Sequence, residues 1–156
     1  MPEPPFDVAH AHRWFAVEFN NRAWDLLEQD SRTADEVQEM IHAAHAAAIH
    51  WQAIGTPLNR QRSENLLATV YGAAQRAEPA VRHARRCLDL SETNAREGAE
   101  SAFDRATALG CAAQAHELAG DDDEAERLMA LATGAAEKLA ADDRAVFDKL
   151  YGRRGL

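Results

Sequence analysis

Alanine constrains the fold of this chain more than any other residue. Of its 156 residues, 34 are Ala, whereas Val and Ile together number only 9. Alanine is the best helix former, while β-strands are enriched in β-branched and aromatic residues. A chain of this length is also long enough to bury a core of its own. The composition therefore predicts an all-α fold, with residues 1–156 forming a single helical domain.

Start and stop signals divide the chain into successive helices. Thr33, followed three residues later by Glu36, has the spacing of a capping box. Gly55 is typical of a helix end, and Thr56-Pro57 combines an N-cap residue with a favoured first helical residue. Gly120 precedes three Asp residues that are expected to cap the next helix. The predicted helices span residues 7–28, 34–54, 57–76, 78–90, 99–118, 124–140 and 142–151, with a loop or junction at 91–98.

Short connections separate these predicted helices, so consecutive helices are expected to pack as antiparallel neighbours. This arrangement gives three helix hairpins, or about six helices, and one further helix. That last helix, residues 142–151, is expected to cap the stack by burying Val146, Phe147 and Leu150. The acidic and Pro-rich residues 1–6 are expected to form a flexible arm before the first helix.

Two stretches of the chain share a pattern of small and bulky residues across consecutive helices. The first stretch contains Leu67, Ala68, Tyr71, Ala80, Ala84, Cys87 and Leu88. The second contains Leu109, Ala113, His116, Gly120, Ala125, Met129 and Ala132, offset by 45 residues from Ala80 to Ala125. This pattern resembles the tetratricopeptide repeat, whose usual period is about 34 residues. The resemblance extends best over residues 56–140 and is weak in the first third of the chain.

The resemblance implies a right-handed α-solenoid of stacked helix hairpins, whose odd-numbered helices line a concave groove. A closed helical bundle is the alternative architecture. Because such grooves usually bind peptides or partner proteins, the resemblance implies a non-enzymatic interaction module with an unknown protein or peptide partner. The residues expected along the groove are Phe19, Arg22, Leu26, Arg62, Asn65, Thr69, Gln114 and Glu117.

Charge is distributed unevenly along the chain. Residues 56–96 carry 7 basic and 4 acidic side chains, a net charge of +3, although the whole chain has a net charge of −9. Arg62 and Asn65 lie on one face of the predicted helix in this segment, where they supply a positive charge and an amide donor for a carboxylate. The segment therefore predicts an extended peptide or an acidic ligand. Alternatively, these arginines pair with neighbouring acids on a solvated surface.

A second interpretation starts from three polar residues of the predicted helix 34–54. Glu39, His42 and His45 follow one another at three-residue intervals, mostly opposite the core stripe of that helix. Imidazole and carboxylate groups are ligands of divalent metals, so a metal-binding helical protein or metalloenzyme is the alternative function. The sequence has no HExxH motif, and the preferred interpretation requires no cofactor.

Pairing of the first two predicted helices extends this alternative. If they pack antiparallel through the turn at Asp30, Glu18 comes near His42. The same pairing brings His10 or His12 near His50. The sequence therefore places imidazoles from two adjacent helices close together near one end of the hairpin.

Other features argue against several function classes. A net charge of −9 disfavours nucleic acid as a partner, because phosphate contacts require clustered Lys and Arg. No apolar run reaches the length of about 18 residues that spans a bilayer, and the first residues lack the pattern of a secretory signal, so a cytoplasmic location without a membrane partner is expected. The absence of GxSxG, CxxC and Gly-rich phosphate motifs disfavours an enzyme. Trp14 and Trp24 leave a homodimer contact open.

Overall fold

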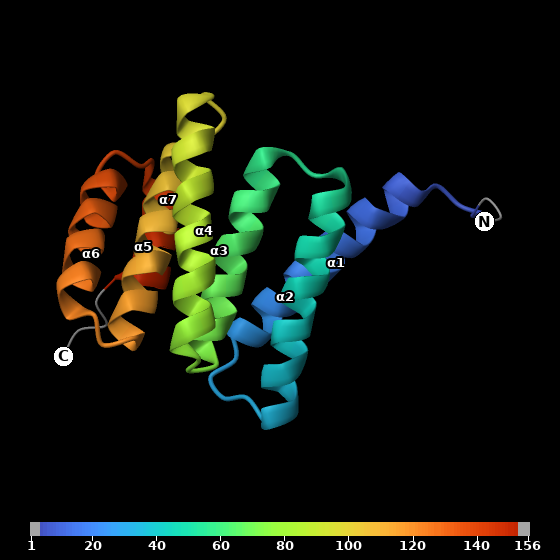
Figure 1. Cartoon of the computed structure of the whole chain (residues 1–156), viewed down its shortest axis with the longest axis horizontal. Coiled ribbons are helices and arrows are strands. Elements are labelled where there is room, and N and C mark those ends of the chain that lie inside the picture. The colour runs from blue at the N-terminus through green and yellow to red at the C-terminus, as the bar shows by residue number, and fades with distance from the viewer. Residues whose placement is uncertain (1–3, 153–156) are drawn as a thin grey trace.

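Residues 4–152 are described by a computed structural model, and within this range the chain forms seven α-helices and no β-strand (Figure 1). The helices are α1 (Val8–Leu27), α2 (Ala34–Ile54), α3 (Pro57–Ala73), α4 (Ala77–Arg96), α5 (Ala102–Leu118), α6 (Asp122–Ala136) and α7 (Ala141–Tyr151). From α1 to α6, consecutive helices pack against each other. The predicted all-α fold of neighbouring packed helices is therefore confirmed.

Two further expectations concern the start of the chain and the membrane. Of the predicted arm, residues 1–3 lie outside the described range, and residues 4–7 precede α1 without helical structure. Among the helices between residues 4 and 152, none combines the length and apolar character that crossing a bilayer requires.

Reciprocal capping boxes begin α2 and α3. The backbone nitrogen of Glu36 lies 3.2 Å from Thr33 Oγ1, and the backbone nitrogen of Thr33 lies 2.8 Å from Glu36 Oε2. The same exchange links Thr56 and Asn59, where the Thr56 nitrogen donates to Asn59 Oδ1 at 3.0 Å. Both predicted N-caps are confirmed, because each satisfies amide groups that the first helical turn leaves free.

The other predicted boundaries differ in detail. Gly120 adopts a left-handed conformation, with φ of 76°, and ends α5 as expected. Asp121 precedes α6 but its side chain accepts no hydrogen bond from that helix; its carboxylate instead lies 3.0 Å from Nδ1 of His116. Gly55 ends α2 as expected, but with φ of −83° and not in the left-handed conformation that Gly120 adopts. Glycine suits this position because a Cβ atom would lie 2.5 Å from the carbonyl oxygen of Trp51.

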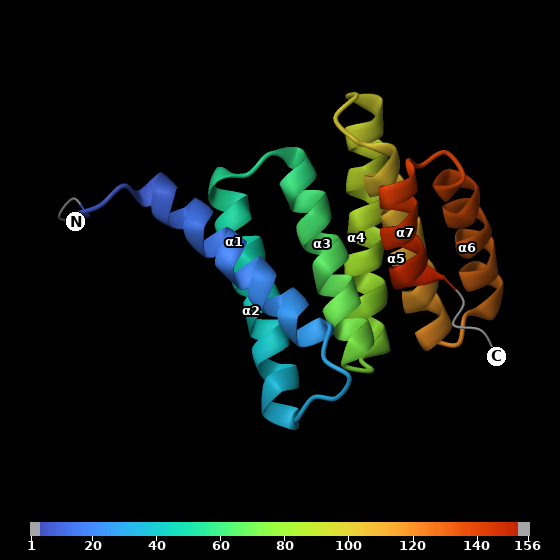
Figure 2. The ribbon, with the colours of Figure 1, turned by 180° about the vertical axis from the view of Figure 1, so that it is seen from behind.

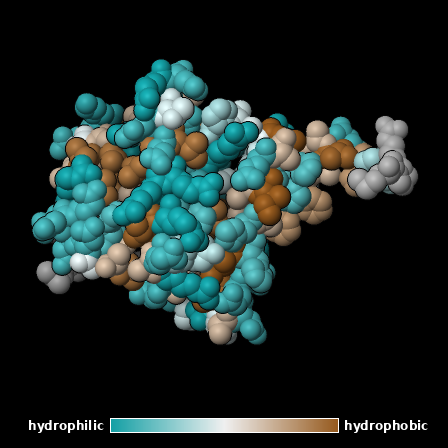
Figure 3. Space-filling model, viewed as in Figure 1, coloured by the Kyte–Doolittle hydropathy of each residue, from teal (hydrophilic) through white to brown (hydrophobic). Residues whose placement is uncertain are grey.

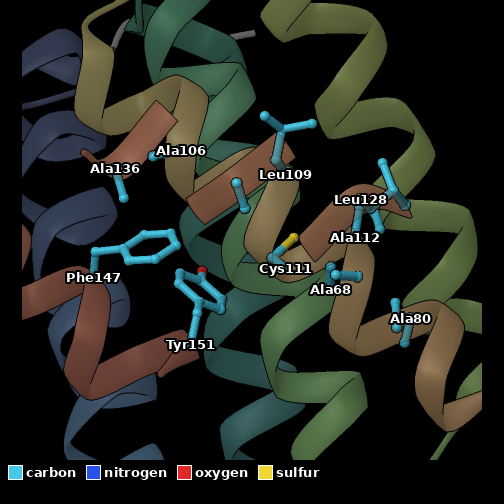
Figure 4. Packing of buried hydrophobic residues seen from close by; sticks show 14 residues of the cluster. Ala68, Ala80, Ala106, Leu109, Cys111, Ala112, Leu128, Ala136, Phe147 and Tyr151 are labelled. Atoms are coloured by element: carbon cyan, nitrogen blue, oxygen red, sulfur yellow. The ribbon is translucent and has the colours of Figure 1, made fainter. Parts of the chain in front are cut away.

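Buried apolar side chains form two clusters that meet at α3. The cluster of α1, α2 and α3 contains several large aliphatic side chains, including Leu26, Met40, Leu66 and Val70. The cluster of α3 to α7 is built mainly from alanines, with the larger side chains Leu109, Leu128, Phe147 and Tyr151 among them (Figure 4). Alanine at the contacts lets helix backbones approach closely at interior packing density, so the Ala-rich sequence fills the C-terminal half with helices rather than side chains.

α4 is longer than the sequence predicted. The range 91–98 was expected to be a loop or junction, but most of it continues α4. Ser91 and Asn94 are fully buried, and Asn94 Nδ2 donates to Gln61 Oε1 at 2.8 Å, while the Ser91 hydroxyl hydrogen-bonds to the carboxylate of Glu100. Because these buried polar groups find partners outside their own helix, their polarity does not mark a loop.

α7 lies against α5, on the face of the molecule that also carries α1 (Figure 2). Phe147 and Tyr151 of α7 point toward α5 and are 3% and 4% exposed (Figure 4). Val146, which was predicted to be buried, is 45% exposed. Tyr151 packs on Gly110 of α5, where a Cβ atom would lie 2.7 Å from the aromatic ring. Glycine at this position of α5 therefore makes room for the last side chain of α7.

Candidate functional site

A cleft opens on the face of the molecule that carries α1 and α7. Its volume is about 460 Å³, and its lining comes mainly from α1, α3, α5 and α7. One wall consists of the α1 residues Asn20, Trp24 and Glu28. The facing wall consists of the α7 residues Val146, Lys149, Leu150 and Tyr151. Residues of α3 and α5 lie between these walls, so helices from both ends of the chain shape the same cleft.

An ion pair joins α3 to α5 inside the cleft. Arg62 donates through Nε and Nη2 to the two carboxylate oxygens of Asp104, at 2.7 and 3.0 Å. The Asp104 side chain is only 5% exposed, whereas that of Arg62 is 57% exposed. Burial alone raises the pKa of Asp104, but hydrogen bonds from Arg62 and Ser101 outweigh it and leave the pKa below its ordinary value. Asp104 is therefore ionised at neutral pH, and the pair adds little net charge to the cleft.

Amide and hydroxyl groups of α3 hold α5 and α7 in place. Asn65 Nδ2 donates to the carbonyl oxygen of Thr107 at 3.1 Å. The hydroxyl of Tyr151 lies near the side chains of Asn65 and Thr69, which lower its pKa. Burial outweighs them and raises the pKa of that hydroxyl well above its ordinary value, so the phenol is neutral. Polar side chains of α3 thus lie against both α5 and α7.

The rim of the cleft carries an ion pair between the two ends of the chain. Lys149 Nζ of α7 lies 3.0 Å from Glu28 Oε1 of α1. The two side chains are 70% and 63% exposed, so water and salt weaken the attraction between them. Trp24, Phe103 and Val146 provide apolar surface in the same cleft. The site thus combines an apolar lining with amide groups and neutralised charges, and holds no obvious catalytic arrangement among the described residues.

Three α1 residues predicted to face the groove lie elsewhere. The ring of Phe19 stacks on that of His50 in α2, with the ring centroids 6.1 Å apart. Arg22 forms an ion pair with Glu39 of α2 at 2.6 Å. Leu26 has no exposed surface and belongs to the core of α1 to α3. None of the three residues lines the cleft between α1 and α7.

The cleft is lined by the side of α1 that carries Trp24, which differs from the side that carries Phe19 and Leu26. A helix turns by about 100° per residue, so residues only one or two positions apart point to different neighbours. Asn20, Trp24 and Glu28 recur every four residues and share one side of α1. Trp24, which lies off the main apolar stripe, was the sequence signal for this second side.

The residues predicted on α3 and α5 fall into two groups. Arg62 and Asn65 line the cleft, as their predicted place in a groove requires. Thr69 donates to the backbone carbonyl of Asn65 at 2.8 Å, and Gln114 donates to a backbone carbonyl of α7 at 2.9 Å. Glu117 is exposed and does not belong to the cleft lining. Gln114 therefore contacts α7, and neither Thr69 nor Gln114 lines the open cleft.

The three residues of the metal alternative do not come together. Glu39 binds Arg22, and His45 Nε2 lies 2.9 Å from the hydroxyl of Tyr71, while His42 is exposed. Among residues 4–152, no group of three His, Cys, Asp or Glu side chains is placed to hold a metal ion. The spacing on α2 therefore does not produce the predicted three-residue site.

A buried polar cluster between α2, α3 and α4 was not predicted. His83 Nδ1 lies 2.7 Å from Glu64 Oε2, and both side chains are less than 10% exposed. The Tyr71 ring stacks on His83, with 5.6 Å between centroids, and its hydroxyl reaches His45. Burial, followed by the nearby His83, lowers the pKa of His45. The available signal was spacing: Glu64 falls seven residues before Tyr71, in the apolar stripe of α3.

Comparison of the chain with known protein families, with curated protein sequences and with solved structures finds no match. No relative therefore supplies an activity or a ligand for the cleft. Its function has to be argued from the contacts, burial and charge of its own residues.

Proposed function

We propose that this chain is a non-enzymatic, tetratricopeptide-like interaction module that binds an extended peptide segment of a partner protein in the cleft between α1 and α7. The observation that carries the proposal is the cleft itself. It lies between the odd-numbered helices, as a groove of that family would, and its volume of about 460 Å³ can admit side chains of a ligand.

The chemistry of the lining suits a peptide. Trp24, Phe103 and Val146 offer apolar surface to one or two side chains of the ligand. Asn20 and Asn65 offer amide groups, which both donate to and accept hydrogen bonds from a peptide backbone. An apolar anchor flanked by backbone contacts is therefore the expected mode of binding.

Arg62 would add a directed hydrogen bond to the site, although its pairing with Asp104 leaves little net charge there. It uses Nε and Nη2 to bind Asp104, which leaves Nη1 for a carboxylate of the ligand. Because the Arg62 side chain is 57% exposed, this contribution should weaken at high salt, where the Debye length is shorter than about 8 Å.

A matched pair of substitutions tests the assignment of the cleft. Val146 and Leu131 are both exposed apolar residues, at 45% and 49%, but only Val146 lines the cleft. Peptides would be selected from a random displayed library against the wild-type chain and then titrated by fluorescence polarisation. Val146→Glu should weaken binding by about tenfold or more, equivalent to about 1.4 kcal/mol, because it places a carboxylate on the apolar wall.

Leu131→Glu should leave the affinity unchanged, because α6 contributes nothing to the cleft. Both variants change exposed positions, so their unfolding free energies should stay within about 0.5 kcal/mol of wild type. Equal affinity of the two variants would place the peptide outside the cleft. Failure to select any peptide above background would count against the module itself.

A further inference from the structure

Two histidines face each other near the open end of the first helix hairpin. His12 of α1 and His50 of α2 have their Nδ1 atoms 2.8 Å apart and their ring centroids 5.0 Å apart. Both side chains are partly exposed. The sequence placed His10 or His12 near His50, and the pairing with His12 confirms this expectation. As a hydrogen bond, the contact requires one ring to donate and the other to accept.

The separation of the two nitrogens also suits a metal ion. Imidazole nitrogens bind divalent late transition metals at about 2.0–2.1 Å. Two ligands at right angles on such a metal are therefore about 2.9 Å apart, close to the separation of the His12 and His50 nitrogens. A tetrahedral ion would need about 3.3 Å, which a small rotation of either ring provides.

Aromatic contacts help to hold the ring of His50 in place. It stacks against both Phe15 and Phe19 of α1, at centroid distances of 5.3 and 6.1 Å.

This pair supplies only two ligands. Within residues 4–152, no third His, Cys, Asp or Glu joins it to make a group of three. A divalent late transition metal usually takes four or more ligands. The pair is therefore half of a site, and the other ligands have to come from outside the chain.

The surroundings of the pair indicate where they come from. Phe6, Val8, Phe15 and Ile49 are 61%, 42%, 39% and 63% exposed. The start of α1 projects from the rest of the molecule, and apolar side chains lie along this part of the surface (Figure 1 and Figure 3). An exposed apolar surface beside an incomplete ligand set is suited to a second protein surface that brings ligands with it.

We propose that His12 and His50 form a half-site for a divalent late transition metal, which is completed by the same two histidines of a second copy of the chain. A two-fold axis through the metal brings four imidazole nitrogens together, because each surface then meets its own equivalent. The apolar side chains around the histidines pack against their counterparts and exclude water from the ion. This inference is independent of the peptide-binding cleft.

Metal-dependent association of the full chain tests the proposal. The protein is prepared without a histidine tag, stripped with a chelator, and titrated separately with Ni²⁺, Cu²⁺ and Zn²⁺ by calorimetry. Its mass is followed by light scattering after size exclusion. The expected result is a monomer with chelator, a dimer with metal, and one ion for every two chains.

Four single substitutions locate the site. His12→Ala and His50→Ala should each weaken metal binding by about tenfold or more and abolish the dimer, because each removes two of the four nitrogens. His10→Ala and His42→Ala are matched controls, since both residues are exposed and outside the pair, and they should bind as wild type does. Circular dichroism confirms that each variant keeps its helices.

Several results would overturn the proposal. A dimer that persists in chelator would remove the metal from the interface. One ion for each chain without dimerisation would remove the second copy. Equal losses from His10→Ala and His12→Ala would show that metal binds to scattered surface histidines.

Discussion

At the C-terminal end of the array, α7 packs on α5 and leaves Phe147 and Tyr151 only 3% and 4% exposed. At the N-terminal end, α1 leaves Trp14 and Phe15 53% and 39% exposed. Both ends consist of helices with aromatic side chains, yet one end is covered by the chain itself and the other is open.

The difference between the two ends depends on one small residue and one additional helix. Gly110 of α5 makes room for Tyr151, and α7 supplies that ring. The exposed large apolar residues confirm the contrast. On α1, α2 and the residues just before them these are Phe6, Val8, Trp14, Phe15, Val17 and Ile49, whereas the other described helices contribute Leu131 and Val146. Association through apolar surface is therefore expected at the N-terminal end.

The largest expected effect comes from removing the ring that seals the C-terminal end. Tyr151→Ala should lower the free energy of unfolding by about 3–5 kcal/mol, since it leaves a cavity over α5 where a buried aromatic was. Phe15→Ala at the open end is the control and should cost about 1 kcal/mol or less, because much of that ring is already in water. Urea denaturation measures the free energy of unfolding of both variants. Equal losses of stability would contradict the contrast between the two ends.

A smaller effect is expected at Gly110, on which the Tyr151 ring packs. Gly110→Ala should destabilise the chain by about 1–3 kcal/mol, because the new methyl group would lie 2.7 Å from the Tyr151 ring. Gly134→Ala is the control: it lies in α6 with no other atom within 4 Å of the added Cβ. Alanine is the better helix former, so this variant should gain up to about 1 kcal/mol. Thermal unfolding measures the two changes in melting temperature. Changes of opposite sign support the contact between Gly110 and Tyr151, and changes of the same sign contradict it.

Local signals gave most of the fold. Thr33 and Thr56 begin α2 and α3 as predicted, because capping depends on residues only three positions apart. The continuation of α4 was missed because the Ser91 hydroxyl and Asn94 Nδ2 find their partners far away in the sequence or in the next connection. Polar residues of this kind look like a loop until their partners are known.

The candidate site could be predicted only in part. Arg62 and Asn65 could be assigned to one side of α3 because that helix has one clear core stripe, and both residues line the cleft. On α1 two apolar sides compete, and the sequence does not say which one faces the cleft. The wall formed by α7 could not be predicted either, since it depends on how Tyr151 packs on Gly110. The contact of His12 with His50 was accessible because it follows from antiparallel pairing alone.

The ion pair inside the cleft should give stability that depends on pH. The pKa of Asp104 is below its ordinary value in the folded chain, since hydrogen bonds from Arg62 and Ser101 outweigh the opposing effect of burial. Its contribution is therefore fully present above the unfolded pKa of about 3.9 and is lost as the pH falls through the folded pKa. Asp104→Asn should cost about 1.5–2 kcal/mol at pH 7, near the lower end of the range for hydrogen bonds to charged groups, because Arg62 is largely exposed.

The two unfolding curves should converge as the pH is lowered below about 4, because wild type loses the contribution that the variant never had. Urea denaturation at several pH values measures the difference. The control is Glu124→Gln. The pKa of Glu124 is also lowered in the folded chain, but by a hydrogen bond from Arg127 on the exposed surface of α6. A difference that stays constant with pH would show that Asp104 acts through packing and not through its charge.

The smallest expected effect concerns an ion pair that connects the two ends of the molecule. Lys149 of α7 and Glu28 of α1 form an ion pair across the rim of the cleft, and both side chains are more than 60% exposed. Exposed pairs of this kind contribute about 0.2–1 kcal/mol, and less at high salt. A double-mutant cycle with Lys149→Met and Glu28→Gln should therefore give a coupling of about 0.5 kcal/mol or less at low salt, vanishing at 1 M salt.

Arg144 and Asp148, which pair within α7, provide a second cycle that does not connect the ends. A coupling across the rim well above that within α7 would mean that α1 and α7 are held together, so the open and closed ends would unfold as one unit. A coupling at or below it leaves α7 bound mainly through Phe147 and Tyr151, as their burial indicates.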